Sequence, residues 1–228
     1  MNLRLSVILL VTVVIGFAAC KNNDNVFKPV IPSYLNVVNA TTDTLNIFVN
    51  GTRQNNTSSL NPGGQSFYLN VPSGTQNYQF KKNLNPVPLF SLPLNLKDST
   101  NYSLYVYGES ASSTFNTIDL LYPDTTAATS TSRAQIRFVN ASPDATDVNV
   151  TFNDTLRYTS IPFKATSGFL KITNGKKIVK VYPSGATSPA VTDTLTFLPG
   201  YIYTVFSRGL VKGTGSKAMN LGVVINLN

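Results

Sequence analysis

Beyond residue 33 the chain consists of short segments in which apolar and polar residues alternate. Ile136 and Phe138 alternate with polar neighbours, and so do Val148 and Val150. A period of two over short segments, separated by Asn-Gly, Ser-Gly and Pro-Gly pairs, predicts half-buried antiparallel strands. No segment beyond Cys20 has a helical period. With about seven strands in each half, the pattern predicts an all-β chain of two tandem immunoglobulin-like, or related, antiparallel β-sandwich domains.

An internal repeat organises these segments. Val38–Asp43 matches Val139–Asp144 at an offset of 101 residues, and the same offset places Ile47 on Val148 and Val49 on Val150. A period of this size indicates a duplicated domain rather than a solenoid. The predicted boundaries are residues 34–122 for the first domain, 123–133 for a small polar linker, and 134–228 for the second domain.

The amino-terminal segment predicts where in the cell the protein is located. Arg4 precedes an apolar run over residues 5–19, which has the layout of a signal peptide and is too short for a membrane span of roughly 20 residues. The run ends in small residues before Cys20, and this junction resembles the lipobox of bacterial lipoproteins. Cys20 is the one cysteine of the chain, so no internal disulfide competes for it.

These features predict a signal peptide over residues 1–19, lipidation of Cys20, and a tether over residues 20–33. The expected partner is the membrane, through the lipid anchor. Lys21 stands where some Gram-negative lipoproteins carry an aspartate that retains them in the inner membrane. The outer membrane is therefore the expected location, with the cell surface favoured over the periplasm.

Composition argues against several chemistries. The chain has no histidine, so it has neither a Ser-His nor a Cys-His pair, and the usual zinc ligands are missing. No glycine-rich phosphate loop precedes a helix. We expect no enzymatic activity, no cofactor and no metal site. The number of acidic residues alone is still compatible with a pair of catalytic carboxylates like that of glycosidases. Long runs of like charge are absent, so nucleic acid is not an expected partner.

The positive charge is concentrated in the second half. Residues 134–228 hold ten basic and four acidic residues, whereas residues 30–124 hold four basic and five acidic ones. Four lysines flank a predicted Asn174-Gly175 hairpin, with Lys171 and Lys180 expected to point outward on adjacent strands. The candidate ligand-binding residues are Arg137, Lys171, Lys176, Lys177 and Lys180. They are suited to an anionic glycan, and the alternative is that lysines here serve solubility and edge protection.

A family resemblance follows from the second repeat. Arg137-Phe-Val-Asn-Ala-Ser-Pro-Asp-Ala145, Gly168-Phe-Leu170 and the Val-Lys-Val-Tyr-Pro segment from Val179 stand in this order. Together they resemble a bacterial family of envelope domains of unknown function. The first repeat departs from the pattern, with Thr41-Thr42 in place of Ser-Pro. The resemblance implies an all-β envelope domain and brings no established activity.

Three further motifs have competing interpretations. Asp43 and Asp144 follow a strand, where Asn and Asp side chains favour a turn and a calcium site is the alternative. Asp124-Thr-Thr resembles a short O-glycosylation motif, which makes Thr125 a candidate acceptor. Exposed tyrosines are candidate sugar platforms, although at strand spacing they are more typical of a core; they are Tyr78, Tyr105, Tyr107, Tyr158 and Tyr182.

Two functions are consistent with these features. The first is a non-catalytic lipoprotein that projects from the outer membrane as a spacer or as a module that contacts another surface protein. The second is a ligand-binding module, in which the basic second domain holds an anionic polysaccharide or another envelope glycan.

Overall fold

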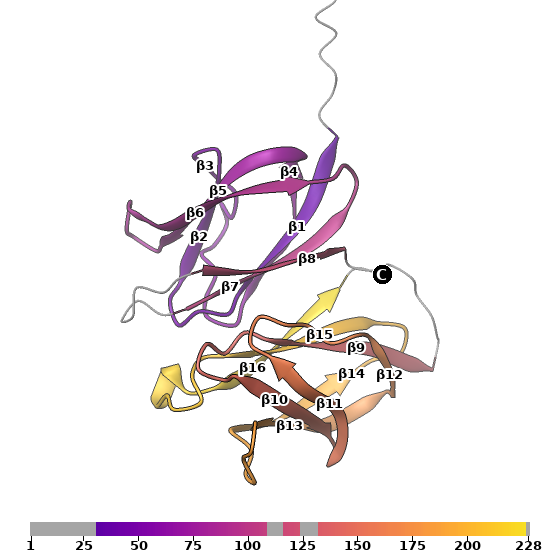
Figure 1. Cartoon of the computed structure of the whole chain (residues 1–228). Helices are drawn as coiled ribbons and strands as arrows, with labels where there is room; N and C mark the ends of the chain where they lie inside the picture. Colours follow the sequence, from indigo (N-terminus) through magenta and orange to yellow (C-terminus); the bar gives the residue numbers. More distant parts are fainter. Residues whose placement is uncertain (1–30, 109–115, 124–131, 227–228) are drawn as a thin grey trace, which may run out of the picture. The chain divides into compact units, whose positions relative to one another are not determined.

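The computed structural model describes residues 31–108, 116–123 and 132–226, and it consists almost entirely of strands (Figure 1). Contacts between backbone positions group residues 31–228 into one compact unit. Within the described part of the chain, no helix is long and apolar enough to cross a membrane. The prediction of an all-β fold is confirmed.

The first repeat contains eight strands rather than the expected seven. They are β1 (Pro32–Asn39), β2 (Leu45–Val49), β3 (Thr52–Arg53), β4 (Gln65–Pro72), β5 (Gly74–Lys82), β6 (Pro88–Leu96), β7 (Asn101–Tyr107) and β8 (Asn116–Pro123). One sheet has the order β4-β1-β7-β8 and the other has the order β3-β2-β5-β6. Every pairing is antiparallel except that of β1 with β7.

The second repeat has the same topology. Its strands are β9 (Arg133–Asn140), β10 (Asp147–Phe152), β11 (Thr155–Pro162), β12 (Leu170–Thr173), β13 (Gly175–Pro183), β14 (Val191–Phe197), β15 (Ile202–Arg208) and β16 (Asn220–Asn226), with a short 3₁₀ helix, η2 (Gly215–Lys217), before β16. The sheet orders are β12-β9-β15-β16 and β11-β10-β13-β14, and β9 pairs with β15 in parallel. Strand for strand, this repeats the arrangement of β1 to β8.

Strand register confirms the 101-residue offset for most of the repeat. Leu35 pairs with Leu69 and Tyr102, and residues exactly 101 positions later make the same pairs: Ile136 with Leu170 and Tyr203. The second strand is the exception, and the offset predicted for it is wrong. Val49 lies opposite Tyr78 in β5, whereas Phe152 lies opposite Val179 in β13, an offset of 152 − 49 = 103. The second repeat therefore has two extra residues between its first and second strands.

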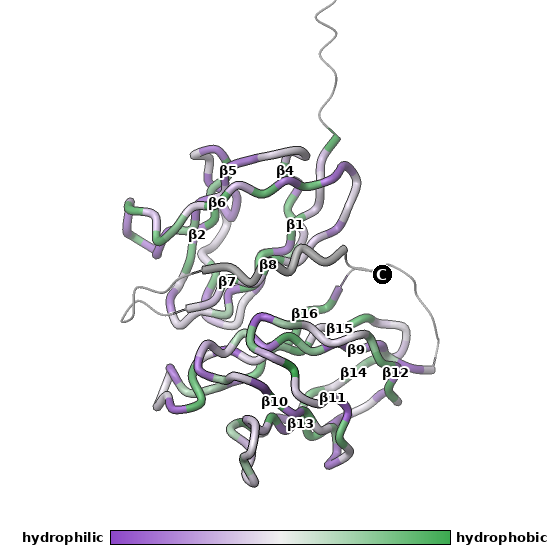
Figure 2. The backbone as a smooth tube through the Cα atoms, in the orientation of Figure 1, coloured by the Kyte–Doolittle hydropathy of each residue, from purple (hydrophilic) through white to green (hydrophobic). Residues whose placement is uncertain are grey.

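Each repeat has its own hydrophobic core between its two sheets. The core of the first repeat centres on Tyr78 and Phe80, and that of the second on Phe138 and Phe197, all fully buried. Hydrophobic stretches on several strands of both repeats are visible in Figure 2. Burying large apolar and aromatic side chains in this way is the main stabilising contribution expected for such sandwiches.

A third apolar cluster includes residues of both repeats at equivalent positions. Val38 and Val139 belong to it, as do Ala40 and Ala141. Tyr105 and Phe206, also 101 residues apart, are in it as well, with ring centroids 5.5 Å apart. This cluster explains why β1 and β9 are buried on both faces in their second halves, where simple alternation predicts one exposed face.

Candidate functional site

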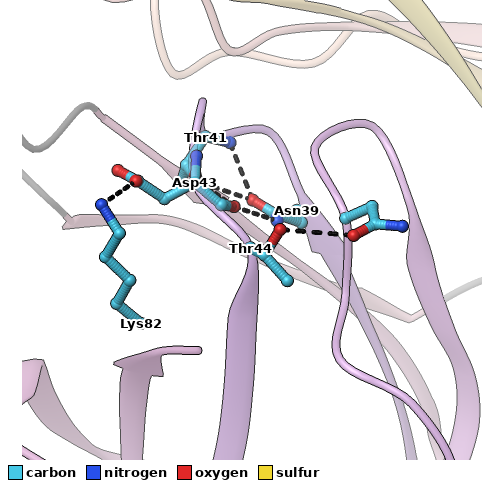
Figure 3. Close-up of polar contacts among 6 residues, drawn as sticks. Asn39, Thr41, Asp43, Thr44 and Lys82 are labelled. Carbon is cyan, nitrogen blue, oxygen red and sulfur yellow. Dashed lines mark hydrogen bonds and ion pairs between the residues drawn. The ribbon is translucent and has the colours of Figure 1, made fainter. Parts of the chain in front are cut away.

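The Val-Asn-Ala motif of the first repeat forms a buried hydrogen-bonded clip at the end of β1 (Figure 3). The Asn39 amide donates to the carbonyls of Asp43 (2.7 Å) and Leu60 (2.8 Å). Its oxygen accepts from the backbone N–H and the hydroxyl of Thr41, at 3.0 and 2.7 Å. Asn39 is fully buried, so water does not reach these polar groups, and the bonds within the protein satisfy them instead. The side chain holds two loops together.

Asn140 makes the corresponding clip in the second repeat. Its amide donates to the carbonyls of Ala145 (3.4 Å) and Ile161 (3.1 Å). Its oxygen accepts from the Ser142 N–H at 3.3 Å and from the Ser207 hydroxyl at 3.0 Å. The buried asparagine of the motif is therefore a structural residue in both repeats.

The aspartates that follow have different partners in the two repeats. The Asp43 carboxylate lies 2.5 Å from the Lys82 amine. The Asp144 carboxylate accepts from the backbone N–H groups of Val211 and Lys212, at 2.8 and 3.1 Å. The predicted turn is correct for the asparagines. The Asp144 carboxylate differs from the prediction, because the backbone amides that it accepts from are distant in the sequence. Across the described residues, no three His, Cys, Asp or Glu side chains lie together as metal ligands would.

A pocket in the second repeat gathers four cationic side chains. It has a volume of about 370 Å³, and Arg133, Arg157, Lys171 and Lys177 line it. The other lining residues are apolar or neutral: Phe152, Asn153, Thr155, Ile172 and Thr173. None of its nine lining residues is acidic. We call this the basic pocket, and its excess of positive charge favours an anion.

The walls of the basic pocket come from both sheets. Arg133 is at the start of β9 and lies opposite Thr173 of β12, so the two share a face of one sheet. Lys177 is on β13 in the other sheet. Its amine donates to the Asn174 carbonyl, 3.3 Å away, which holds the side chain near the turn between β12 and β13.

This geometry corrects the predicted hairpin at Asn174-Gly175. The two residues join β12 to β13, which belong to different sheets, so the turn crosses from one sheet to the other. Lys171 and Lys180 are consequently not on adjacent strands. Gly175 has a φ of +97°, a conformation that glycine adopts without strain, and this is the property that an Asn-Gly pair offers to a hairpin as well.

The remaining candidates lie outside the basic pocket. Arg137 is only 4% exposed, which is a correction to its predicted place on a surface. Its Nε donates to the Thr204 hydroxyl at 2.8 Å, and its guanidinium stacks 4.8 Å from the Phe169 ring. Lys176 is exposed on β13.

Lys180 is neutralised by a neighbour. Its amine donates to the Asp154 carboxylate at 2.6 Å. This hydrogen bond raises the pKa of Lys180 above its ordinary value. The pair is largely open to solvent, so it contributes little to stability, but it removes Lys180 from the charge available to a ligand.

The first repeat has no basic pocket at the equivalent place. The positions that match Arg133, Lys171 and Lys177 are Pro32, Asn70 and Gln76, all neutral. Strand pairing supports this alignment, because Pro32 lies opposite Pro72 just as Arg133 lies opposite Thr173. The two repeats therefore share one topology, but only the second has cationic residues at these positions.

Sequence reasoning missed Arg133, because it was assigned to the linker. Its position at the start of β9, opposite Thr173, is the signal that identifies it. Cys20 and Thr125 lie outside the described residues. The tyrosines proposed as sugar platforms are mostly core residues: Tyr78, Tyr105, Tyr107 and Tyr158 are each at most 5% exposed.

Comparison with known proteins identifies the family. The model of a domain of unknown function, DUF4397, matches residues 33–151 and again residues 134–224. The chain belongs to this family and carries the domain in tandem. A search of the curated proteins finds no match.

Solved structures give two weak likenesses. The Bacillus anthracis TIE protein is 10% identical over 86% of this chain, with a TM-score of 0.26, and this chain spans only 44% of its length. A crystal structure from Bacteroides fragilis, named "putative cell adhesion protein", is 10% identical over 82% of this chain and 84% of its own, with a TM-score of 0.22. Scores this low carry no argument about fold or function.

Proposed function

We propose that this protein is an envelope lipoprotein, held in the outer membrane by lipid on Cys20, whose second repeat binds an anionic polysaccharide in the basic pocket. The observation that supports the ligand is the set of four cationic side chains around about 370 Å³, with no carboxylate among the residues that line it. A volume of this size is in the range of small-molecule sites, roughly 300–1,000 Å³.

The chemistry of the pocket favours a carboxylated or sulfated sugar. Arg133 and Arg157 offer planar forks that pair with two oxygens of one acidic group, and Lys171 and Lys177 act as point charges. Phe152 and Ile172 provide an apolar floor for the carbon skeleton of a sugar ring. Because the pocket opens to solvent, the attraction should weaken as salt screens it.

Titration with polygalacturonate and heparin tests the ligand. The protein is the chain from residue 21 onward, and isothermal titration calorimetry is run over a salt series. The pocket variant Lys171→Gln/Lys177→Gln should bind at least about tenfold more weakly at low salt, because it removes two charges that face the ligand. A matched control, Lys176→Gln/Lys212→Gln, removes the same charge from exposed positions outside the pocket and should change the affinity less than about threefold.

Two outcomes would overturn the ligand proposal. Equal loss in the two double variants would mean that net charge, not the pocket, attracts the polymer. No binding of either polymer by the wild-type chain would leave the spacer or protein-contact function, which rests on the tether and the tandem repeat alone.

The anchor is tested separately in cells. Cys20→Ser should release the protein from the outer-membrane fraction, and metabolic labelling with a fatty acid should mark the wild type and not the variant. Digestion of intact cells with an added protease then distinguishes the surface from the periplasm. Membrane retention of Cys20→Ser after signal cleavage would contradict the lipid anchor.

A further inference from the structure

The first repeat contains a second pocket, of a different character. It has a volume of about 470 Å³ and is lined only by uncharged residues: Gln54, Asn55, Asn56, Thr57, Ser58, Leu60, Gln65, Ser66, Phe67 and Leu69. Four of these carry side-chain amides, three carry hydroxyls and three are apolar. We call it the amide pocket. It lies between the loop that follows β3 and the first residues of β4.

Phe67 projects from this pocket in an unusual conformation. Its side chain is 68% exposed, and its φ of +55° lies in the left-handed region, which is strained for a bulky residue. The pairing of β1 with β4 is irregular here, since Asn36 lies opposite Tyr68 and Val38 opposite Gln65. Two residues of β4 thus face one residue of β1, which is a β-bulge on an edge strand.

The fold does not require an aromatic ring at this position. The second repeat has Gly168 there, preceded like Phe67 by a serine. The two serines play the same part, because Val37 N–H donates to the Ser66 hydroxyl and Phe138 N–H donates to the Ser167 hydroxyl, both at 2.8 Å. Only the first repeat places a large exposed ring beside the bulge. Strain and an exposed phenyl ring both cost free energy, and such costs concentrate at functional sites.

Hydrogen bonds of Asn55 and Gln65 hold the polar wall of the amide pocket in place. Asn55 is 6% exposed; its oxygen accepts from the Ile47 N–H at 2.9 Å, and its amide donates to the Ser58 carbonyl at 2.9 Å. Asn55 thereby fixes the loop that presents Asn56 and Thr57 to solvent. The Gln65 oxygen accepts from the Asn36 amide at 2.8 Å, which orients the Gln65 NH₂ group as a donor.

We propose that the amide pocket binds a neutral sugar residue of a glycan, with Phe67 as the platform on which the ring packs. A pyranose has an apolar C–H face, which suits a phenyl ring, and hydroxyls that both donate and accept hydrogen bonds. Side-chain amides and hydroxyls match that mixed character. The absence of charged residues from the lining disfavours an acidic sugar or a phosphate there. This site is independent of the basic pocket.

The test uses three neutral probes, maltotetraose, cellotetraose and laminaritetraose, each titrated into the ¹⁵N-labelled chain from residue 21 onward. Chemical-shift changes should concentrate at residues 54–58 and 65–69 for at least one probe, with a dissociation constant on the order of millimolar, which is typical of a shallow site without charges. Phe67→Tyr keeps an aromatic platform and should bind within about threefold of the wild type.

Phe67→Gly is the informative loss variant, since the second repeat shows that glycine is compatible with this edge of the sandwich. It should weaken binding at least about tenfold while the rest of the spectrum stays unchanged. The Lys171→Gln/Lys177→Gln variant should bind the neutral probes as the wild type does, which separates this site from the basic pocket. No shift at residues 54–58 and 65–69 with any probe, or shifts that Phe67→Gly leaves intact, would overturn the proposal.

Discussion

The hydroxyl of Tyr158 donates a 2.7 Å hydrogen bond to the backbone carbonyl of Ile136, which belongs to the opposite sheet of the second repeat. The bond crosses the core and joins the two layers of the sandwich. Tyr78 is buried just as deeply in the first repeat, yet its hydroxyl has no hydrogen-bond partner among the described residues. One buried tyrosine hydroxyl therefore makes a hydrogen bond, and the other does not.

Removing the two hydroxyls should have opposite effects. Tyr158→Phe removes the hydrogen bond to the Ile136 carbonyl and should lower the free energy of unfolding by about 1–2 kcal/mol. Tyr78→Phe removes an unsatisfied buried polar atom and should leave stability unchanged or raise it by up to about 1 kcal/mol. Urea denaturation at pH 7 measures both. Equal losses in the two variants would contradict the difference in hydrogen bonding.

The same tyrosines predict sensitivity to alkali. Burial raises the pKa of Tyr78 to about 12, and burial raises the pKa of Tyr158 as well. An unfolded tyrosine titrates near pH 10, so below that value both tyrosines are neutral in the folded and in the unfolded chain, and stability has its full value. It declines as the pH rises from there through the folded pKa.

Stability should therefore fall between about pH 10 and pH 12, with a slope of up to about 1.4 kcal/mol per pH unit for each tyrosine. The urea midpoint, followed from pH 8 to pH 11.5, measures the slope. Tyr78→Phe should make it shallower, and an unchanged slope in that variant would show that other groups cause the alkaline loss.

The buried asparagines carry a second stability prediction. Asn140→Ala would leave two backbone carbonyls, one N–H and the Ser207 hydroxyl without their partner in a buried place. We expect a loss of roughly 2–4 kcal/mol in the free energy of unfolding. Asn149→Ala is the control, because Asn149 makes one exposed contact, to the Ser160 N–H, and should cost less than about 1 kcal/mol. Similar losses at both positions would mean that the clip has no special role.

Local patterns predicted the fold class well because alternation and turn residues report directly on half-buried strands. They did not distinguish a hairpin from a turn between sheets at Asn174-Gly175, since both need a residue with positive φ. The pattern of apolar and polar residues also did not reveal the two extra residues before β10. A shift of two keeps the same face of a strand inward, so the alignment of Val49 with Val150 still matched apolar with apolar.

The candidate site was predicted in part. Lys171 and Lys177 are in the basic pocket, whereas Arg137 is covered because β9 is buried on both faces at that point. Alternation within one strand carries no information on what packs against its outer face. Phe67 was not predicted either, because a phenylalanine in a strand-like segment is ordinarily a core residue, and the bulge that exposes it appears only in the pairing of β1 with β4.

The strain at Phe67 leads to a last prediction, which needs no ligand. At a φ of +55°, a Cβ atom is unfavourable whatever the side chain, so Phe67→Ala keeps the strain and Phe67→Gly relieves it. Phe67→Gly should be more stable than Phe67→Ala by about 1 kcal/mol, even though glycine loses more conformational entropy on folding. Urea midpoints of the two variants measure the difference. The exposed ring packs against little, so the wild type should lie close to Phe67→Ala; a wild type clearly more stable than both would mean that the ring serves packing, and would weaken its assignment as a platform held ready for a sugar.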